Sequence, residues 1–206
     1  IGAITNHEYD ENGRMTAQID HFGNRTEYEY DEDGNRTVVR DALDNETVTA
    51  FDLLGRPVLV TYPDGTAEST AYDALGRQVR RTDRAGRTQI TAYDTAGNVT
   101  STQMEVPDGQ GTQTVTLSSA TYDTAGRVVT STNADGLTLT HAYDAFGRQV
   151  QTTWPDTTFT AATYGPAGVL TQTDRLGATT VYAYDAFGRL VSVTAPPAAP
   201  GAAQAV

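Results

Sequence analysis

The hexapeptide Tyr143-Asp144-Ala145-Phe146-Gly147-Arg148 recurs in near copies along the whole chain of 206 residues. Nine copies begin at aromatic residues that lie 21, 21, 21, 21, 29, 21, 21 and 20 residues apart. A fixed period of this length indicates a repeat protein, in which the recurring residues specify the fold. The candidate structural positions are Tyr9, Asp10, Gly13, Arg14, Tyr30, Asp31, Gly34, Phe51, Asp52, Gly55, Arg56, Tyr72, Asp73, Gly76, Arg77, Tyr93, Asp94, Gly97, Tyr122, Asp123, Gly126, Arg127, Tyr143, Asp144, Gly147, Arg148, Tyr164, Gly168, Tyr184, Asp185, Gly188 and Arg189.

The motif predicts a tight turn. Asp at its first turn position can accept a hydrogen bond from a backbone N–H two residues on, and Gly at the fourth can adopt positive φ without steric cost. This pattern favours a type I turn closed by a left-handed Gly, with a bulge in the strand. The turn at 165–168 lacks the Asp, so we expect it to be the least well capped.

A second turn follows about ten residues after each first turn, as in Asp83-Arg84-Ala85-Gly86. Each repeat is therefore expected to be one β-hairpin. The second turns vary more, and those at 41–45 and 155–157 have no Gly. We expect the strict first row to be packed against something and the variable second row to be exposed, as loops on one face of a repeat array often are.

The segments between turns are rich in Thr, Val, Tyr and Gln, and none has the 3.6-residue apolar period of a helix. The sequence predicts an all-β fold of tandem hairpins with a thin core. The recurring Tyr side chains are expected to stack as an aromatic ladder. The Arg after each first turn is expected to pack its stem on a neighbouring Tyr and to meet a turn Asp of the next repeat. A ligand-binding row of Arg is the alternative.

The formal net charge is −12, and all 14 basic residues are Arg. Such a field repels phosphate backbones, so nucleic-acid partners are disfavoured. There is no Cys, no apparent signal peptide, and no apolar run long enough to span a bilayer. We expect a fragment of a longer chain, with hairpin repeats over 1–195, an inserted loop near 105–111 and a Pro/Ala-rich linker or tail over 196–206.

Tyr-Asp-x-x-Gly-Arg at 21-residue spacing, as in 143–148 and 184–189, resembles the YD repeat of bacterial Rhs proteins, Tc-toxin B and C components, wall-associated proteins and teneurins. The resemblance implies a β-strand spiral that forms a hollow shell, and in the toxin members the shell encloses a polypeptide. It also implies a secreted or cell-surface location. Rhs and toxin members carry a self-cleavage site around Asp-Pro-x-Gly; this chain has no Asp-Pro pair, so no catalytic residue is carried over.

Three other functions have weaker support in the sequence. Asp31-Glu32-Asp33 could belong to a calcium loop, although most copies lack the second acid. Paired acids could suggest a glycosidase, and a triad could use Ser118 and His141, but neither has a supporting motif. We expect no enzyme activity, cofactor or metal. The second functional hypothesis is a surface adhesion or carbohydrate-binding array. Open strand edges also favour end-to-end self-association or cover by further repeats.

Overall fold

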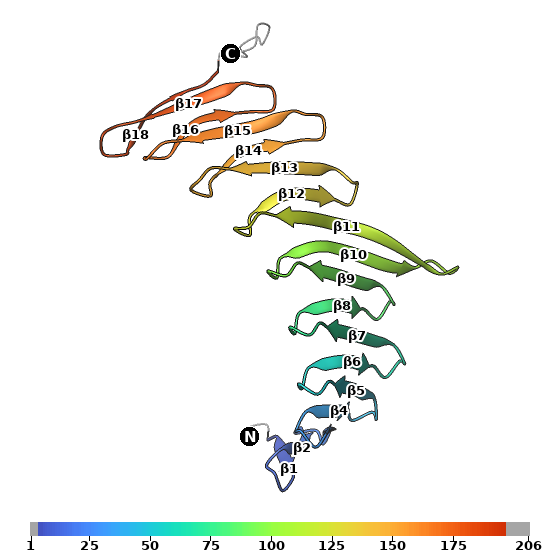
Figure 1. The fold of residues 1–206 in the computed structure, drawn as a ribbon. Helices are drawn as coiled ribbons and strands as arrows, with labels where there is room; N and C mark the ends of the chain where they lie inside the picture. Colours follow the sequence, from blue (N-terminus) through green and yellow to red (C-terminus); the bar gives the residue numbers. More distant parts are fainter. Residues whose placement is uncertain (1–3, 197–206) are drawn as a thin grey trace, which may run out of the picture. The chain divides into compact units, whose positions relative to one another are not determined.

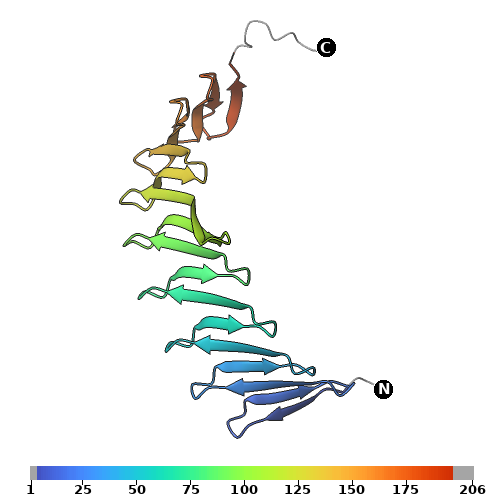
Figure 2. The same cartoon turned by 90° about the vertical axis from the view of Figure 1, so that its right-hand side faces the viewer.

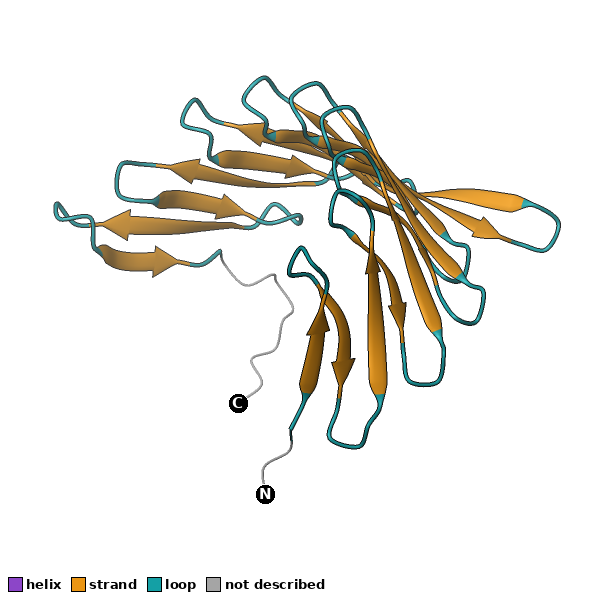
Figure 3. Ribbon diagram, turned by 90° about the horizontal axis from the view of Figure 1, so that it is seen from below, coloured by secondary structure: helices purple, strands orange, loops and turns teal. Residues whose placement is uncertain are grey.

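The computed structural model describes residues 4–196. Over that range every regular element is a strand, and turns join the strands at both ends (Figure 1, Figure 3). The predicted all-β hairpin repeat is therefore confirmed. The described part of the chain has no helix of the length and apolar character needed to cross a membrane. The tail predicted over 196–206 falls outside the described residues, apart from Pro196.

There are 18 strands in the described range. The first nine are β1 (Asn6–Tyr9), β2 (Met15–Ile19), β3 (Arg25–Tyr30), β4 (Arg36–Arg40), β5 (Glu46–Phe51), β6 (Pro57–Thr61), β7 (Ala67–Tyr72), β8 (Gln78–Thr82) and β9 (Thr88–Tyr93). The others are β10 (Val99–Pro107), β11 (Thr112–Tyr122), β12 (Val128–Asn133), β13 (Thr138–Tyr143), β14 (Gln149–Thr153), β15 (Phe159–Tyr164), β16 (Val169–Thr173), β17 (Thr179–Tyr184) and β18 (Leu190–Thr194).

The chain divides into two compact units, which are described separately. Unit 1 holds residues 1–92 and 102–115, and unit 2 holds 93–101 and 116–206. Within each unit every strand pairs antiparallel with the next strand of the sequence, for example β3 with β4 and β15 with β16. In unit 1 the successive hairpins follow one another along the sheet (Figure 2). Pairing of neighbours in sequence is what a 21-residue hairpin repeat requires, because each short turn can join only antiparallel strands.

Turns of both rows share one backbone geometry, except the shorter turns at 108–111 and 165–168. In the first row, the Gly147 N–H donates to the Asp144 carbonyl at 3.0 Å and the Asp144 N–H donates to the Arg148 carbonyl at 2.9 Å. Gly147 has φ 81° and Gly86 of the second row has φ 76°. The register shifts between Ala142 and Tyr143, where the extra residue is accommodated. The predicted left-handed glycine and strand bulge are therefore present.

Two second-row turns place other residues in the left-handed position. Asp44 has φ 60° and Thr157 has φ 67°. Each donates its N–H to the carbonyl three residues earlier, as the glycines do. Hairpin closure thus imposes positive φ even where no Gly is present. A β-branched residue is especially strained there, because its side chain crowds the backbone.

Replacing Thr157 with Gly is expected to stabilise the protein by about 1 kcal/mol. Relief of strain of about 1–3 kcal/mol is partly offset by the greater freedom of Gly in the unfolded chain. Urea unfolding would measure the gain. Ala145→Gly is the control, because Ala145 is in a turn of the same unit without positive φ, and a loss of some tenths of a kcal/mol is expected there. A loss at Thr157 would contradict the strain argument.

The core is thin, as predicted. Ala17 is fully buried, and the other buried side chains in the described residues are Thr88 and Thr152. Threonine hydroxyls pair across neighbouring strands, with Thr82 and Thr88 joined at 2.8 Å and Thr163 and Thr171 at 2.6 Å. Hydrogen-bonded Thr pairs therefore join neighbouring strands at both part-buried and exposed positions.

The first-row turns were expected to be packed and the second-row turns exposed. Within the described chain this prediction is wrong, because turns of both rows are exposed. Phe146 at a first-row tip is 85% exposed and Leu176 at a second-row tip is 95% exposed. Both tips project beyond the strand ends, where no neighbouring strand can cover them. The rows differ instead in the contacts made by the residue that follows each turn.

The insertion near 105–111 is also different from the expected loop. Residues up to Pro107 belong to β10, and β11 begins at Thr112, so most of the insertion lengthens one hairpin. Only 108–111 form the turn, where Asp108 Oδ1 accepts the Gln110 N–H at 2.9 Å. The alternating side chains of 102–106 and 112–116 suit strands, and this pattern outweighs the loop-forming composition of the tip.

Candidate functional site

The aspartate of the first-row motif caps its own turn. Asp144 Oδ1 accepts the N–H groups of Phe146 at 2.9 Å and Arg148 at 3.0 Å, and its Oδ2 accepts Arg148 Nε at 2.7 Å. The hairpin brings residue i+4 back beside residue i, so one carboxylate satisfies three donors. The same aspartate–arginine ion pairs are Asp10–Arg14, Asp52–Arg56, Asp73–Arg77, Asp123–Arg127 and Asp185–Arg189.

Two first-row turns carry Asn in place of Arg. Asp31 Oδ2 accepts Asn35 Nδ2 at 2.9 Å, and Asp94 Oδ2 accepts Asn98 Nδ2 at 2.9 Å. In these two turns the Asn Nδ2 donates to the Asp Oδ2, as the Arg Nε does in the others. Tyr164 leads instead into the shorter turn at 165–168, where Gly165 N–H donates to the Gly168 carbonyl at 2.8 Å and Gly168 has φ 151°. No aspartate caps that turn, as the sequence predicts.

The arginine then reaches the next repeat. The Arg127 guanidinium lies 4.8 Å from the Tyr143 ring centroid, and its Nη1 donates to the Asp144 carbonyl at 3.3 Å. Arg14 does the same with Tyr30, at 4.9 Å, and with the Asp31 carbonyl, at 3.0 Å. Equivalent stacks are Arg56 on Tyr72 at 4.2 Å and Arg148 on Tyr164 at 4.6 Å. The contact with the neighbouring tyrosine is as predicted.

The predicted carboxylate partner of this arginine is wrong. The arginine pairs with the Asp of its own turn and reaches the next turn through a backbone carbonyl. The side chain leaves the strand beside the Asp four residues earlier, so the nearest carboxylate is the local one. One guanidinium can serve both partners because its donors point in several fixed directions.

The tyrosine completes the link in the reverse direction. Its hydroxyl donates to the carbonyl of the residue after the preceding repeat's Arg or Asn, as from Tyr143 to Val128 at 2.9 Å. Tyr30, Tyr72, Tyr122 and Tyr164 make the same bond to Met15, Pro57, Val99 and Gln149. Phe51 has no hydroxyl to donate, and Tyr9 is 61% exposed.

The expected ladder of aromatic rings is replaced by contacts between one ring and one guanidinium group. Within residues 4–196 the ring-to-ring contacts recorded are His7 with Tyr9 and His21 with Phe22. The Arg after one turn instead lies over the Tyr ring of the next turn, as Arg127 does over Tyr143. We use the name first-row brace for this contact, in which the Arg after one turn lies over the Tyr of the next turn.

The turn glycine also leaves room for a side chain of the preceding repeat. A Cβ built on Gly76 would lie 3.2 Å from Arg56 Nη1, and one on Gly55 would lie 3.1 Å from Asn35 Oδ1. The side chain after one turn therefore lies directly against the glycine of the next turn. Gly13 and Gly34 have open space at the same position.

The RHS Repeat family pattern matches residues 9–46, 72–113, 122–158 and 166–196, which is well over half of the chain. The chain belongs to the RHS-repeat family. A comparison with curated proteins found no match.

Solved structures share the fold of this RHS-repeat chain. They include the TcdB2-TccC3-Cdc42 crystal structure, with TM-score 0.53 and 16% identity, and TcdB2-TccC3 without its hypervariable C-terminal region, with TM-score 0.51 and 17% identity. Each alignment covers 93% of this chain and 13% of the other, so this chain spans a small part of those proteins. At this identity the likeness concerns the fold.

The second row of the RHS repeats contains a brace that the sequence did not reveal. Arg84 lies 4.2 Å from the Tyr62 ring centroid, donates through Nε to Thr66 Oγ1 at 2.9 Å and pairs with Asp64. Arg175 makes the same three contacts: it lies over the Trp154 ring, donates to Thr158 and pairs with Asp156. The shared pattern of an aromatic residue, Pro, Asp, any residue and Thr at 62–66 and 154–158 could have identified this contact.

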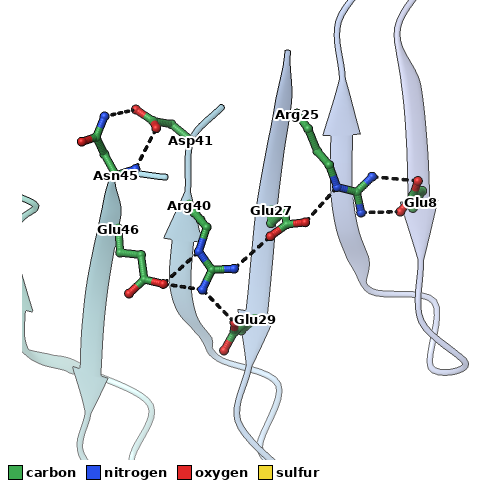
Figure 4. A network of polar contacts seen from close by, with 8 residues as sticks. All are labelled: Glu8, Arg25, Glu27, Glu29, Arg40, Asp41, Asn45 and Glu46. Atoms are coloured by element: carbon green, nitrogen blue, oxygen red, sulfur yellow. Dashed lines mark hydrogen bonds and ion pairs between the residues drawn. The ribbon is translucent and has the colours of Figure 1, made fainter. Parts of the chain in front are cut away.

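An ion network crosses the N-terminal strands of unit 1 (Figure 4). Arg25 donates to Glu8 through two nitrogens at 2.8 and 2.7 Å and to Glu27 at 2.8 Å. Arg40 joins Glu27 at 2.9 Å and also contacts Glu46. The pairing register places Glu8, Ala17 and Glu27 in one row. The fully buried Ala17 therefore lies beneath the bridge between Glu8 and Arg25.

Acidification is expected to weaken the first-row turns. The backbone hydrogen bond from Arg127 holds the pKa of Asp123 below its ordinary value of 3.8; partial burial opposes this, and the Arg127 side chain adds to the lowering. Because the folded pKa is the lower one, this stabilisation is complete above the ordinary value and is lost as pH falls through the folded pKa.

Asp123→Asn is therefore expected to lower stability at neutral pH and to flatten the dependence of stability on pH below about pH 4. Urea midpoints measured between about pH 6 and about pH 2.5 would test this. Asn133 provides an internal comparison, because its Oδ1 already accepts the N–H groups of Asp135 and Leu137 at 3.0 Å without a titrating group. An unchanged pH slope in Asp123→Asn would contradict the assignment.

The residues of the calcium and triad alternatives have other contacts. The Asp31 carboxylate accepts hydrogen bonds from the backbone and side chain of Asn35. Among residues 4–196 no three His, Asp or Glu side chains are grouped to hold a metal ion. His141 Nε2 lies 3.1 Å from Ser131 Oγ rather than beside Ser118. Its Nδ1 faces Gln149 and Thr152, at 3.3 and 3.4 Å.

Proposed function

We propose that this chain is a non-enzymatic wall segment of an Rhs-type shell, which scaffolds or encloses a polypeptide cargo. The observation that supports the proposal is the first-row brace, in which Arg127 joins Asp123, Tyr143 and the Asp144 carbonyl. The recurring polar groups bond to one another and to backbone atoms of adjacent turns. Such a use of the motif suits a self-supporting wall built from many repeats.

The motif residues are proposed to be structural throughout the nine copies over 1–195. A carbohydrate-binding array would need rows of open aromatic rings, whereas arginine lies over Tyr30, Tyr72, Tyr143 and Tyr164. The sheet edges fit further repeats of a longer protein: every residue of β18 is exposed. A secreted or cell-surface location is proposed with the shell.

The full-length protein encoded by the same gene would test the shell. Electron cryo-microscopy is expected to show one face of this segment lining a closed lumen. Limited proteolysis is expected to spare the enclosed segment until denaturant opens the shell, with the same segment expressed alone as the control. Digestion of the segment at equal rates in the two forms, or a wall without a lumen, would contradict enclosure.

A further inference from the structure

One repeat of unit 2 has a glycine in the position of the brace arginine. The turn at 165–168 is one residue shorter than the turn before it, and the Gly168 carbonyl accepts the hydrogen bond that the Arg148 carbonyl accepts there. Gly168 therefore stands where the brace arginine stands in the other repeats, but it has no side chain. Within residues 4–196 no arginine is recorded over the ring of the next tyrosine, Tyr184.

A pocket of about 430 Å³ lies beside this tyrosine. Pro166, Ala167 and Leu170 line it from the shorter turn and β16, and Tyr184 and Asp185 line it from the next repeat. All of these residues belong to unit 2. We call this the Tyr184 pocket.

The turn glycines show what the pocket replaces. A Cβ built on Gly147 would meet Arg127 Nη1 at 3.6 Å. At Gly188, which also lines the pocket, the neighbour in the equivalent place is the Ala167 methyl group, at 3.7 Å. A methyl group thus stands where the preceding repeats have a guanidinium, and the remaining space forms the pocket.

The two groups that hold a guanidinium in the preceding repeats are present at the Tyr184 pocket. Arg127 and Arg148 each lie over the next tyrosine ring, at 4.8 and 4.6 Å, and donate to the carbonyl that follows it, at 3.3 and 3.4 Å. The corresponding groups are the Tyr184 ring and the Asp185 carbonyl. That carbonyl accepts the Gly188 N–H at 3.0 Å, and its second lone pair can accept another donor.

The surrounding charge favours a cation from outside the chain. Asp185 is the one acid among the lining residues, no basic residue lines the pocket, and the chain carries a net charge of −12. The arginines in the described part of unit 2 already form ion pairs with aspartates; these are Arg127, Arg148, Arg175 and Arg189. The unit therefore does not supply an arginine for this pocket.

From the glycine in the arginine position and the retained ring and carbonyl, we propose that the Tyr184 pocket binds an arginine side chain of another polypeptide. The guanidinium lies over the Tyr184 ring and donates to the Asp185 carbonyl, and the apolar stem lies against Pro166 and Leu170. Lysine is a poorer match, because its ammonium is compact and strongly hydrated and cannot stack flat on a ring. This binding goes beyond the shell function and does not depend on it.

The test is NMR titration of the isotope-labelled chain with the acetylated and amidated peptide Gly-Gly-Arg-Gly-Gly. The amide signals of 166–170 and 184–188 are expected to shift saturably, with Kd of about 10 mM or tighter. The same peptide with citrulline, which has nearly the shape of arginine without its charge, is expected to bind at least about fivefold more weakly. The lysine peptide is also expected to bind more weakly than the arginine peptide.

A restored turn provides the second test. Replacing 165–168 with the five residues found at 144–148 gives the repeat its own arginine and is expected to weaken binding of the arginine peptide at least about tenfold. Gly168→Arg alone would not do this, because a Cβ on Gly168 would lie 2.9 Å from the Tyr184 hydroxyl. Thr163→Ala is the control with unchanged affinity, because its hydroxyl pairs with Thr171 on the same two strands and neither residue lines the pocket.

The converse variant should create a second site. Arg127→Ala removes the guanidinium over Tyr143, so the arginine peptide is expected to shift the signals of 143–147 as well, whereas in the natural chain those signals stay unchanged. The proposal is overturned if the arginine peptide shifts no signals saturably, if the citrulline or lysine peptide binds equally well, if the restored turn binds as tightly as the natural chain, or if Arg127→Ala gains no site. The three peptides decide the question on the natural chain even if a variant does not fold.

Discussion

Arg127→Ala is expected to lower the free energy of unfolding by about 2 kcal/mol. The substitution removes a cation over the Tyr143 ring, worth about 0.5–2 kcal/mol, and the hydrogen bond to the Asp144 carbonyl in the next turn. It also leaves Asp123 without its guanidinium partner. Urea unfolding monitored by Trp154 fluorescence, which reports on the same unit, would measure the loss.

Arg189→Ala is the matched control in the same row and unit. Arg189 pairs with the Asp of its own turn at 2.7 Å, and it lies over Phe187 of that turn rather than over a following tyrosine. Its side chain is 75% exposed, so a loss of about 0.5 kcal/mol or less is expected. Equal losses at Arg127 and Arg189 would show that the ion pair within a turn carries the effect and that the brace between repeats does not.

A double-mutant cycle separates the brace from its parts. Tyr143→Leu removes the ring under Arg127 together with the hydroxyl bond to Val128. If ring and guanidinium interact, the double variant loses less than the sum of the single losses, with a coupling of about 1 kcal/mol. Additive losses would contradict the contact as an energetic link between repeats.

Local chemistry made the turns predictable. Asp and Gly three residues apart specify a hairpin turn that ends in a left-handed glycine. Asp144 and Gly147 could therefore be placed from their spacing alone. The same closure acts at Thr157, where sequence preference points away from positive φ. There the pairing of the flanking strands overrides the preference of a single residue, and no local pattern reveals that outcome.

Contacts between strands were harder to predict. The bridge over Ala17 depends on a register that places Glu8 and Glu27 in the same row, and one residue more in either turn would separate them. The partner of Arg127 depended on where the hairpin returns the chain, which favours Asp123 over the next carboxylate. The hollow over β14 to β17 is visible only when Thr160 and Gln172 are compared with Glu68 and Arg81 in three dimensions.

Gly147→Val is expected to cost about 3 kcal/mol, and Gly136→Val in the second row about 1–2 kcal/mol. Both glycines have nearly the same φ, 81° and 79°, so backbone strain is common to the two variants. The difference comes from Arg127: its Nη1 would lie 3.6 Å from a Cβ on Gly147, and the methyl groups of valine extend further, whereas Gly136 has open space.

Alanine at the same two positions isolates the strain. Gly147→Ala and Gly136→Ala are expected to lose similar amounts, about 1 kcal/mol each, because alanine is not β-branched and a contact at 3.6 Å is ordinary packing. Only the valine pair should separate. Urea midpoints of the four variants would measure this, with unchanged m-values as the check on a common unfolded state. Equal losses for the two valine variants would mean that the Arg127 side chain moves aside without loss of stability. The short distance between the first-row brace and the turn glycine would then have no energetic consequence.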